Sequence, residues 1–204
     1  YDFAVVRYHA NGTLDTSFNG TGTLLTNIGG VSIDQGNSVT VQADGKIVVA
    51  GYSTSGGSNN FAVVRYNANG SLDTSFNGTG NRVTDIGSGS NDWGSSVTVQ
   101  ADGKIVVAGT SDSNFAVVRY NVDGRLDTSF NGTGTRVTDI GSGSNDWGNS
   151  VTVQADGKIV VAGDSSSYGT STFAVVRYNA NGTLDTGFNG TGTLVTGIGN
   201  SIWD

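Results

Sequence analysis

Hydrophobic and polar residues alternate over short stretches of this chain, and no stretch has the spacing of an amphipathic helix. Residues 38–42 alternate with a period of two, which predicts a strand with one buried face. The β-branched stretches 46–51 and 61–66 predict two strands buried on both faces. Residues 82–86 predict a short fourth strand, and Asp44-Gly45 is typical of a type I′ hairpin turn between the first two strands.

This strand pattern returns at a nearly constant interval. The third-strand sequence FAVVRY begins at Phe3, Phe61, Phe115 and Phe173, with spacings of 58, 54 and 58 residues. The segment SVTVQADGKIVVAG lies between these copies, at residues 38–51, 96–109 and 150–163. Four short antiparallel strands per repeat predict an all-β fold of β-propeller blades, which are four-stranded sheets. A β-solenoid, whose repeats are usually shorter, and a sandwich of repeats are the alternatives.

The strands amount to about three and a half blades in this chain. We expect residues 1–204 to form one repeat array, with repeat units starting near residues 3, 61, 115 and 173. A closed propeller needs at least about four blades. We therefore expect the array to be part of a larger propeller or assembly, through self-association or covalent continuation into further blades.

Composition narrows the classes of function. The chain has no Pro, Cys, Met or Glu, so it offers neither a disulfide framework nor a thiolate metal site. Its formal net charge of −7 argues against a nucleic-acid partner, which would require a basic face. No apolar stretch approaches the roughly 18 residues of a membrane span, so we expect no membrane insertion. An acidic, polar, Cys-free bacterial surface protein fits this composition, as does an ordinary soluble protein.

The repeat unit FxVxRYNxxGxLDxxFNGxG, followed by DGKIVVAG, resembles the bacterial delta-60 repeat family. The resemblance covers essentially the whole chain, and the Phe, Arg, Gly, Leu-Asp and Phe positions match in every copy. It implies β-propeller blades of the kind found in large secreted or surface proteins. It also implies a non-catalytic module, and no catalytic residue is carried over from the family.

An arginine and an aspartate eight residues apart recur in every repeat. Arg65 shares one strand face with Phe61 and Val63, and Asp73 follows beyond a turn. An arginine beside apolar side chains needs a planar carboxylate partner, so we expect a structural ion pair, with an anion site as the alternative. The four pairs are Arg7 with Asp15, Arg65 with Asp73, Arg119 with Asp127, and Arg177 with Asp185.

One loop is similar to short calcium-binding loops. Asn121, Asp123 and Asp127 place oxygen donors at its positions 1, 3 and 7, with a glycine at position 4. Ca²⁺ prefers several carboxylates, whereas the other copies offer mostly Asn, which Asx turns explain equally well. We therefore predict no cofactor, with Ca²⁺ at this loop as the alternative.

Two tryptophans lie in a Gly-rich stretch that we expect to be a loop. Trp93 follows Asp92, Trp147 follows Asp146, and Trp203 lies close to the last residue. An aromatic face beside a carboxylate is typical of sugar sites, which makes a glycan a candidate partner. Large aromatic side chains are also needed between blades, and we expect these tryptophans to pack there, with the sugar site as the alternative.

No catalytic set is apparent, because His9 is the only histidine and Cys and Glu are absent. We predict that the chain is not an enzyme. The expected function is an extracellular or cell-surface bacterial module, structural or adhesive, that provides a scaffold for surface interactions or self-assembly. The alternative is a lectin-like carbohydrate-binding propeller that uses the Trp-containing loops.

Overall fold

A computed structural model describes residues 1–29, 33–87, 89–141, 143–167 and 170–197, and it confirms the all-β prediction. Fourteen strands form four antiparallel sheets, and the described residues contain no helix. It follows that no helix in this part of the chain could cross a membrane.

The sheets follow one another along the sequence. Sheet 1 contains β1 (Phe3–Val6) and β2 (Thr23–Thr26). Sheet 2 contains β3 (Asp34–Val41), β4 (Ile47–Ser55), β5 (Ser58–Tyr66) and β6 (Asn81–Thr84). Sheet 3 contains β7 (Asp92–Val99), β8 (Ile105–Ser111), β9 (Asn114–Tyr120) and β10 (Thr135–Thr138). Sheet 4 contains β11 (Asn145–Val153), β12 (Ile159–Ser167), β13 (Thr170–Tyr178) and β14 (Thr193–Thr196).

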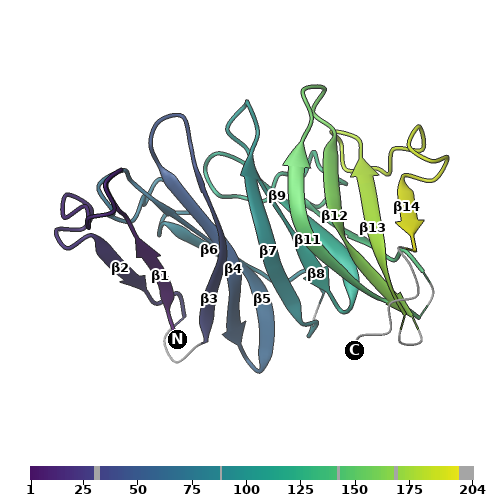
Figure 1. The fold of residues 1–204 in the computed structure, drawn as a ribbon, viewed down its shortest axis with the longest axis horizontal. Helices are drawn as coiled ribbons and strands as arrows, with labels where there is room; N and C mark the ends of the chain where they lie inside the picture. Colours follow the sequence, from purple (N-terminus) through teal and green to yellow (C-terminus); the bar gives the residue numbers. More distant parts are fainter. Residues whose placement is uncertain (30–32, 88, 142, 168–169, 198–204) are drawn as a thin grey trace.

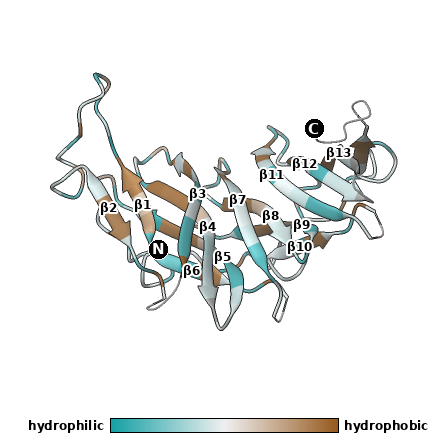
Figure 2. Ribbon diagram, turned by 60° about the horizontal axis from the view of Figure 1, so that its bottom comes forward, coloured by the Kyte–Doolittle hydropathy of each residue, from teal (hydrophilic) through white to brown (hydrophobic). Residues whose placement is uncertain are grey.

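The four sheets lie side by side in chain order, from β1 and β2 at one end to β13 and β14 at the other (Figure 1). The first strands of neighbouring complete sheets contact each other, β3 with β7 and β7 with β11. Figure 2 shows the row bent into an arc. Each complete sheet is therefore a propeller blade, and sheet 1 is the third- and fourth-strand half of one.

Several strand limits differ from the sequence prediction. In sheet 2, β4 continues four residues and β5 three residues into the expected loop as a hairpin, in which Ser55 pairs with Ser58. The positive φ of Gly56 (64°) and Gly57 (92°) closes this hairpin. The predicted type I′ turn at Asp44-Gly45 is wrong, because only Gly45 has a positive φ (81°) and its N–H bonds the Gln42 carbonyl. That geometry is a type I turn followed by a left-handed glycine, which suits a three-residue loop.

Apolar side chains of the middle strands fill the seams between sheets. Val106, Val107 and Ala108 of β8 are fully buried, as predicted for a strand covered on both faces. Three clusters result, one in each seam, and each combines third-strand residues of one sheet with second- and third-strand residues of the next. The core is thus continuous along the row rather than central.

Glycines let the first strand of one sheet approach the second strand of the preceding sheet closely. A Cβ on Gly94 would lie 2.6 Å from the Gly51 carbonyl oxygen of the preceding sheet. Gly148 repeats this geometry against Gly109, at 2.5 Å. Because any side chain would push the backbones apart, these positions fix the spacing of the sheets.

Candidate functional site

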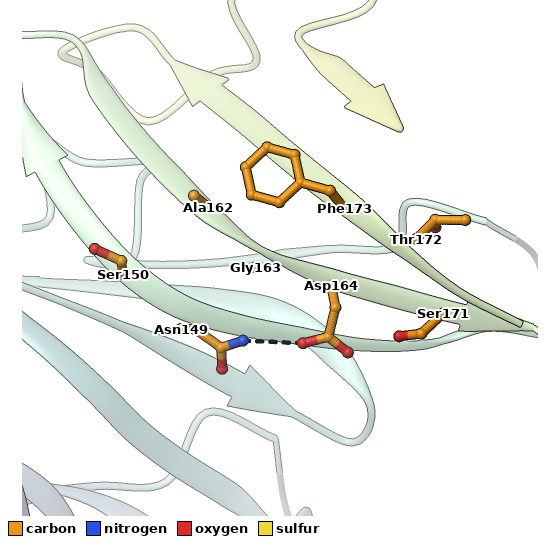
Figure 3. A pocket seen from close by; sticks show the side chains of 8 residues that line it. All are labelled: Asn149, Ser150, Ala162, Gly163, Asp164, Ser171, Thr172 and Phe173. Carbon is orange, nitrogen blue, oxygen red and sulfur yellow. Dashed lines mark hydrogen bonds between the residues drawn. The ribbon is translucent and has the colours of Figure 1, made fainter. Parts of the chain in front are cut away.

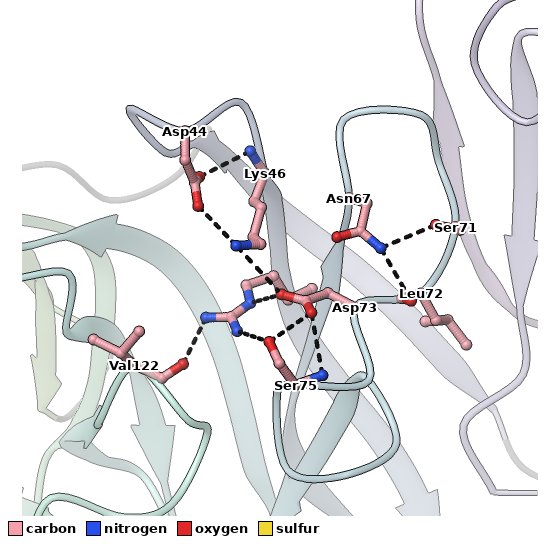
Figure 4. Close-up of polar contacts among 9 residues, drawn as sticks. Asp44, Lys46, Asn67, Ser71, Leu72, Asp73, Ser75 and Val122 are labelled. Carbon is pink, nitrogen blue, oxygen red and sulfur yellow. Dashed lines mark hydrogen bonds and ion pairs between the residues drawn. The ribbon is translucent and has the colours of Figure 1, made fainter.

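The most elaborate polar cluster is centred on the recurring arginine, and we name it the arginine latch. In sheet 2, Arg65 Nε donates to Asp73 Oδ2 at 2.7 Å, and Arg65 Nη2 donates to Ser75 Oγ at 3.1 Å. Asp73 Oδ1 in turn accepts from the Ser75 hydroxyl at 2.6 Å and from its N–H at 3.1 Å. Figure 4 shows this network around Asp73.

The latch also crosses to the following sheet. Arg65 Nη1 donates to the carbonyl of Val122 at 2.7 Å, and Val122 belongs to the turn after β9 of sheet 3. The guanidinium carbon lies 4.8 Å from the centre of the Phe76 ring, a cation–π contact. A single arginine therefore makes hydrogen bonds within its own sheet and to the next sheet.

All four repeats contain the predicted arginine–aspartate pair. The Nε–Oδ2 distances are 2.8 Å for Arg7 with Asp15, and 2.7 Å for Arg65 with Asp73, Arg119 with Asp127, and Arg177 with Asp185. The structure brings these side chains together as an ion pair, in contact with a phenylalanine ring each time. At Arg7, Arg65 and Arg119 the carboxylate, a serine hydroxyl and a carbonyl of the next sheet occupy all three guanidinium nitrogens, which leaves no site for an external anion.

A lysine completes the latch, and the sequence reasoning missed it. Lys104, at the β7–β8 turn, places its Nζ 3.1 Å from Asp127 Oδ2, and Lys158 does the same to Asp185 at 3.1 Å. Lys46 lies farther from Asp73, at 3.9 Å. The signal was present as the invariable DGK of each first hairpin, but nothing in the linear order places that hairpin beside the aspartate.

The arginine latch lowers the pKa of its aspartate. Burial raises the pKa of Asp127, but hydrogen bonds from Ser129 and Lys104 and the charge of Arg119 outweigh burial and lower the pKa to about 2. The pKa of Asp73 is lowered as well, against a similar burial effect, by Ser75 and Arg65. These carboxylates are therefore ionised at neutral pH, which suits ion pairing and not general acid catalysis.

The calcium alternative does not fit the loop geometry. Asp127 turns its carboxylate to Arg119 and Lys104, so two cations already occupy the side on which a metal would bind. Asn121 Nδ2 donates to the Leu126 carbonyl at 3.4 Å, and Asp123 Oδ1 accepts from the Arg125 N–H at 3.0 Å. These are turn contacts, and among the described residues no group of three His, Cys, Asp or Glu could hold a metal ion.

Asp92 and Asp146 do not have the role that was predicted for a ligand-binding loop. Both are fully buried, as is Asp34 at the equivalent place in sheet 2 with 1% exposure. Their Oδ2 atoms accept backbone N–H groups that follow the preceding fourth strand, from Ile86 to Asp92 at 2.8 Å and from Ile140 to Asp146 at 2.9 Å. A buried carboxylate that ties one sheet to the next has no surface to offer a glycan, so this assignment is corrected.

The tryptophans lie on strands rather than on a loop. Trp93 is the second residue of β7 and Trp147 the third residue of β11, opposite Thr110 and Asp164 of the second strands. Their ring centres are 5.6 Å apart, with the planes tilted by 34°, so the two rings stack across the seam between sheets 3 and 4. Trp147 is still 39% exposed. Trp203 lies outside the described residues.

A groove of about 370 Å³ opens on the free side of sheet 4 (Figure 3). Asn149 Nδ2 donates to Asp164 Oδ1 at 2.9 Å along it. The Phe173 ring, 46% exposed, forms its apolar wall. An aromatic face beside hydroxyl, amide and carboxylate groups has the composition of a small-molecule site.

A serine, an aspartate and the one histidine meet only in sheet 1. Ser17 Oγ donates to Asp15 Oδ1 at 2.6 Å, and His9 Nε2 lies 3.6 Å from the same oxygen. The hydroxyl therefore bonds the carboxylate and not the imidazole, which is the reverse of the order that activates a serine nucleophile. The His9 position carries Asn in the other repeats, in keeping with a turn residue.

The match to a family model supports the fold. A family model described as "Domain of unknown function (DUF5122) beta-propeller" matches residues 1–18, 42–76, 100–130 and 154–188. Among solved structures, a protein of unknown function from Dyadobacter fermentans DSM 18053 is similar with a TM-score of 0.46 and 12% identity. The match covers 74% of this chain and 49% of that one, so this chain spans about half its length. No curated protein matches the chain.

Proposed function

Because the chain belongs to the β-propeller family described as a domain of unknown function (DUF5122), we propose that it is a non-catalytic structural module. In this proposal its blades form a scaffold for surface contacts or self-assembly outside a bacterial cell. The extracellular placement rests on the resemblance to repeats of large secreted and surface proteins.

The arginine latch is the observation that carries this proposal. Arg119 is 4% exposed, and its guanidinium donates within its own sheet to Asp127 (2.7 Å) and Ser129 (3.1 Å) and to Ala180 of the next sheet (2.6 Å). The same network recurs where sheets 1 and 2 meet the sheets that follow them. Buried charges that pair with each other and span each seam serve cohesion, because none is left to bind or transform a substrate.

The lectin-like alternative is favoured by the groove of Figure 3. Its volume of about 370 Å³ lies in the range of small-molecule sites, and Phe173 and Asp164 line it. A sugar could stack on the Phe173 ring in this groove or, separately, on the exposed part of the Trp147 ring.

The experiment combines a stability assay with a glycan array on the purified chain. We expect one cooperative unfolding transition, resistance to limited proteolysis, and no glycan retained above the level of Trp147→Ala and Phe173→Ser variants. Both variants change exposed side chains, so circular dichroism must show that their fold is intact. If the native chain retains a glycan that a folded variant does not, the scaffold function is wrong and the lectin-like function takes its place.

A further inference from the structure

Three polar contacts and one ring contact recur at each of the three seams. A third-strand tyrosine bonds a threonine of the preceding sheet: Tyr66 with Thr26 at 2.8 Å, Tyr120 with Thr84 at 2.9 Å, and Tyr178 with Thr138 at 2.9 Å. A latch arginine bonds a carbonyl of the following sheet, namely Ala68, Val122 or Ala180. A backbone N–H does the same, from Asn19 to Asn69 at 2.8 Å, from Asn77 to Asp123 at 2.7 Å, and from Asn131 to Asn181 at 2.7 Å.

The ring contact lies between a phenylalanine and a glycine of the next sheet. A Cβ on Gly124 would lie 2.9 Å from the Phe76 ring, and one on Gly182 would lie 2.8 Å from the Phe130 ring. Gly12 has the same left-handed conformation (φ 82°), yet nothing lies within 4 Å of its Cβ position. No phenylalanine of a preceding sheet therefore packs against Gly12 in the described structure.

Sheet 1 carries the receiving half of this contact set uncovered. We name it the leading face, consisting of Ala4, Val6, Tyr8, Ala10, Asn11 and Gly12. Val6 is 45% and Tyr8 58% exposed, whereas the equivalent Val64 and Tyr66 of sheet 2 are fully buried. The hydroxyl of Tyr8 has no threonine partner among the described residues.

Sheet 4 carries the donating half uncovered. We name it the trailing face, consisting of Phe173, Val175, Arg177, Phe188, Asn189 and Thr196. Phe173 is 46% exposed, whereas Phe115 of sheet 3 is fully buried. The Arg177 side chain is 23% exposed against 5% for Arg119, and in the described part of the chain no carbonyl of a following sheet accepts from its Nη1. Thr196 is exposed, whereas Thr138 is 5% exposed.

The seam between sheets 1 and 2 shows that a two-stranded sheet suffices on one side. Sheet 1 has no first or second strand in the structure, yet Phe3 and Phe18 are fully buried against sheet 2. The tyrosine, arginine and backbone N–H contacts are all formed there. Third- and fourth-strand elements are therefore enough to dock a half-sheet on a complete one.

We propose that a second copy of this chain docks its leading face on the trailing face of the first, head to tail. Tyr8 of one copy then bonds Thr196 of the other, Arg177 bonds the Ala10 carbonyl, and the Asn189 N–H bonds the Asn11 carbonyl. Phe188 lies against Gly12, as Phe76 lies against Gly124. This pairing deepens the proposed structural function, because it names self-assembly and the residues that direct it.

The first-strand side of the groove of Figure 3, at Asn149 and Ser150, stays open in this docking, whereas Phe173 on its other side lies in the contact. At internal seams the same place holds a first strand, for example where Val151 N–H bonds Ser96 Oγ at 3.2 Å. Ser150 is the equivalent of Ser96 and lines the groove. Each copy also keeps one unused face after pairing, since the two faces differ, so the contact is heterologous and leads to rings or filaments.

Sedimentation velocity across a range of concentrations tests the pairing. We expect the 204-residue chain to associate with rising concentration. Val6→Lys and Thr196→Lys should each weaken association at least about tenfold, because each places an unpaired charge in the contact. Val137→Lys is the matched control: it changes charge equally at a 41% exposed valine outside both faces and outside the latch, and it should associate like the native chain.

Cross-linking tests the register, since the chain has no native cysteine. A mixture of Tyr8→Cys and Thr196→Cys single variants should give a mixed dimer with a short bismaleimide. A mixture of Val122→Cys and Thr196→Cys should not. A chain that stays monomeric at every concentration, or association that is indifferent to both face variants, overturns the pairing. A monomer that still unfolds cooperatively and retains no glycan would leave the scaffold function standing.

Discussion

Replacing Asp127 by alanine should destabilise the chain more than any exposed aspartate substitution. The change removes the acceptor of Arg119 Nε at 2.7 Å and of Lys104 Nζ at 3.1 Å. The Lys104 side chain is 28% exposed and can turn to water, whereas the Arg119 side chain is 5% exposed and cannot. The penalty is therefore mainly that of one buried, uncompensated arginine, about 3–5 kcal/mol.

The pKa of Asp127 gives an independent magnitude. A folded pKa of about 2, against an unfolded value near 3.9, corresponds to roughly 2–3 kcal/mol of stability at neutral pH. Because the folded pKa is the lower one, this stability is present above about pH 4 and is lost as the pH falls towards about 2. Asp127→Asn keeps the shape but removes the charge, so its loss should lie near this smaller figure.

Urea denaturation followed by circular dichroism at pH 7 and at several acidic pH values measures both effects. Asp85→Ala, which removes an exposed carboxylate, is the control and should cost less than about 0.5 kcal/mol. The acid decline of Asp127→Ala should be shallower than that of the native chain. The reasoning fails if Asp127→Ala costs less than about 1 kcal/mol or if the acid declines are identical.

Further substitutions test the seams. Burial raises the pKa of Tyr120 to about 12, so its contribution to stability should be lost as the pH rises from about 10 to 12. Tyr120→Phe should cost about 1 kcal/mol and flatten that alkaline decline in denaturation curves; an unchanged decline would contradict the assignment. Gly109→Ala places a Cβ 1.8 Å from the Trp93 carbonyl oxygen and should cost more than about 3 kcal/mol, whereas Gly197→Ala meets nothing within 4 Å; equal melting temperatures would argue against the close approach. Trp147→Ala should change the emission of Trp93, which it stacks on at 5.6 Å, and identical spectra would mean that the rings do not touch in solution.

Much of the fold can be predicted from sequence, because strand formation and repetition are local properties. The β-branched stretch around Val106 and the alternating stretch before it lie in strands, and the arginine–aspartate recurrence does produce ion pairs. Packing of Trp93 between neighbouring blades was predicted, but its place on a strand was not, because the first strand continues past an irregularity in pairing between Gly94 and Ser96. That irregularity leaves no mark in the alternation of residues.

The cross-sheet part of the latch was beyond sequence reasoning for another reason. Lys104 reaches Asp127 only because the β7–β8 hairpin folds over the connection between β9 and β10. Arg65 donates to the main-chain carbonyl of Val122. Because every residue has such a carbonyl, no residue type in the sequence indicates this contact. Contacts of this kind are defined by the path of the backbone alone.

The use of a carbonyl as the latch acceptor has a consequence for how such a chain changes its length. The accepting residue is alanine at positions 68 and 180 and valine at position 122, and the bond forms in each case. A duplicated or deleted repeat therefore meets a compatible neighbour at once, without a matching substitution on the other side. The number of repeats can rise and fall by recombination between nearly identical segments, and each new pair of neighbouring sheets can still form the arginine–carbonyl hydrogen bond.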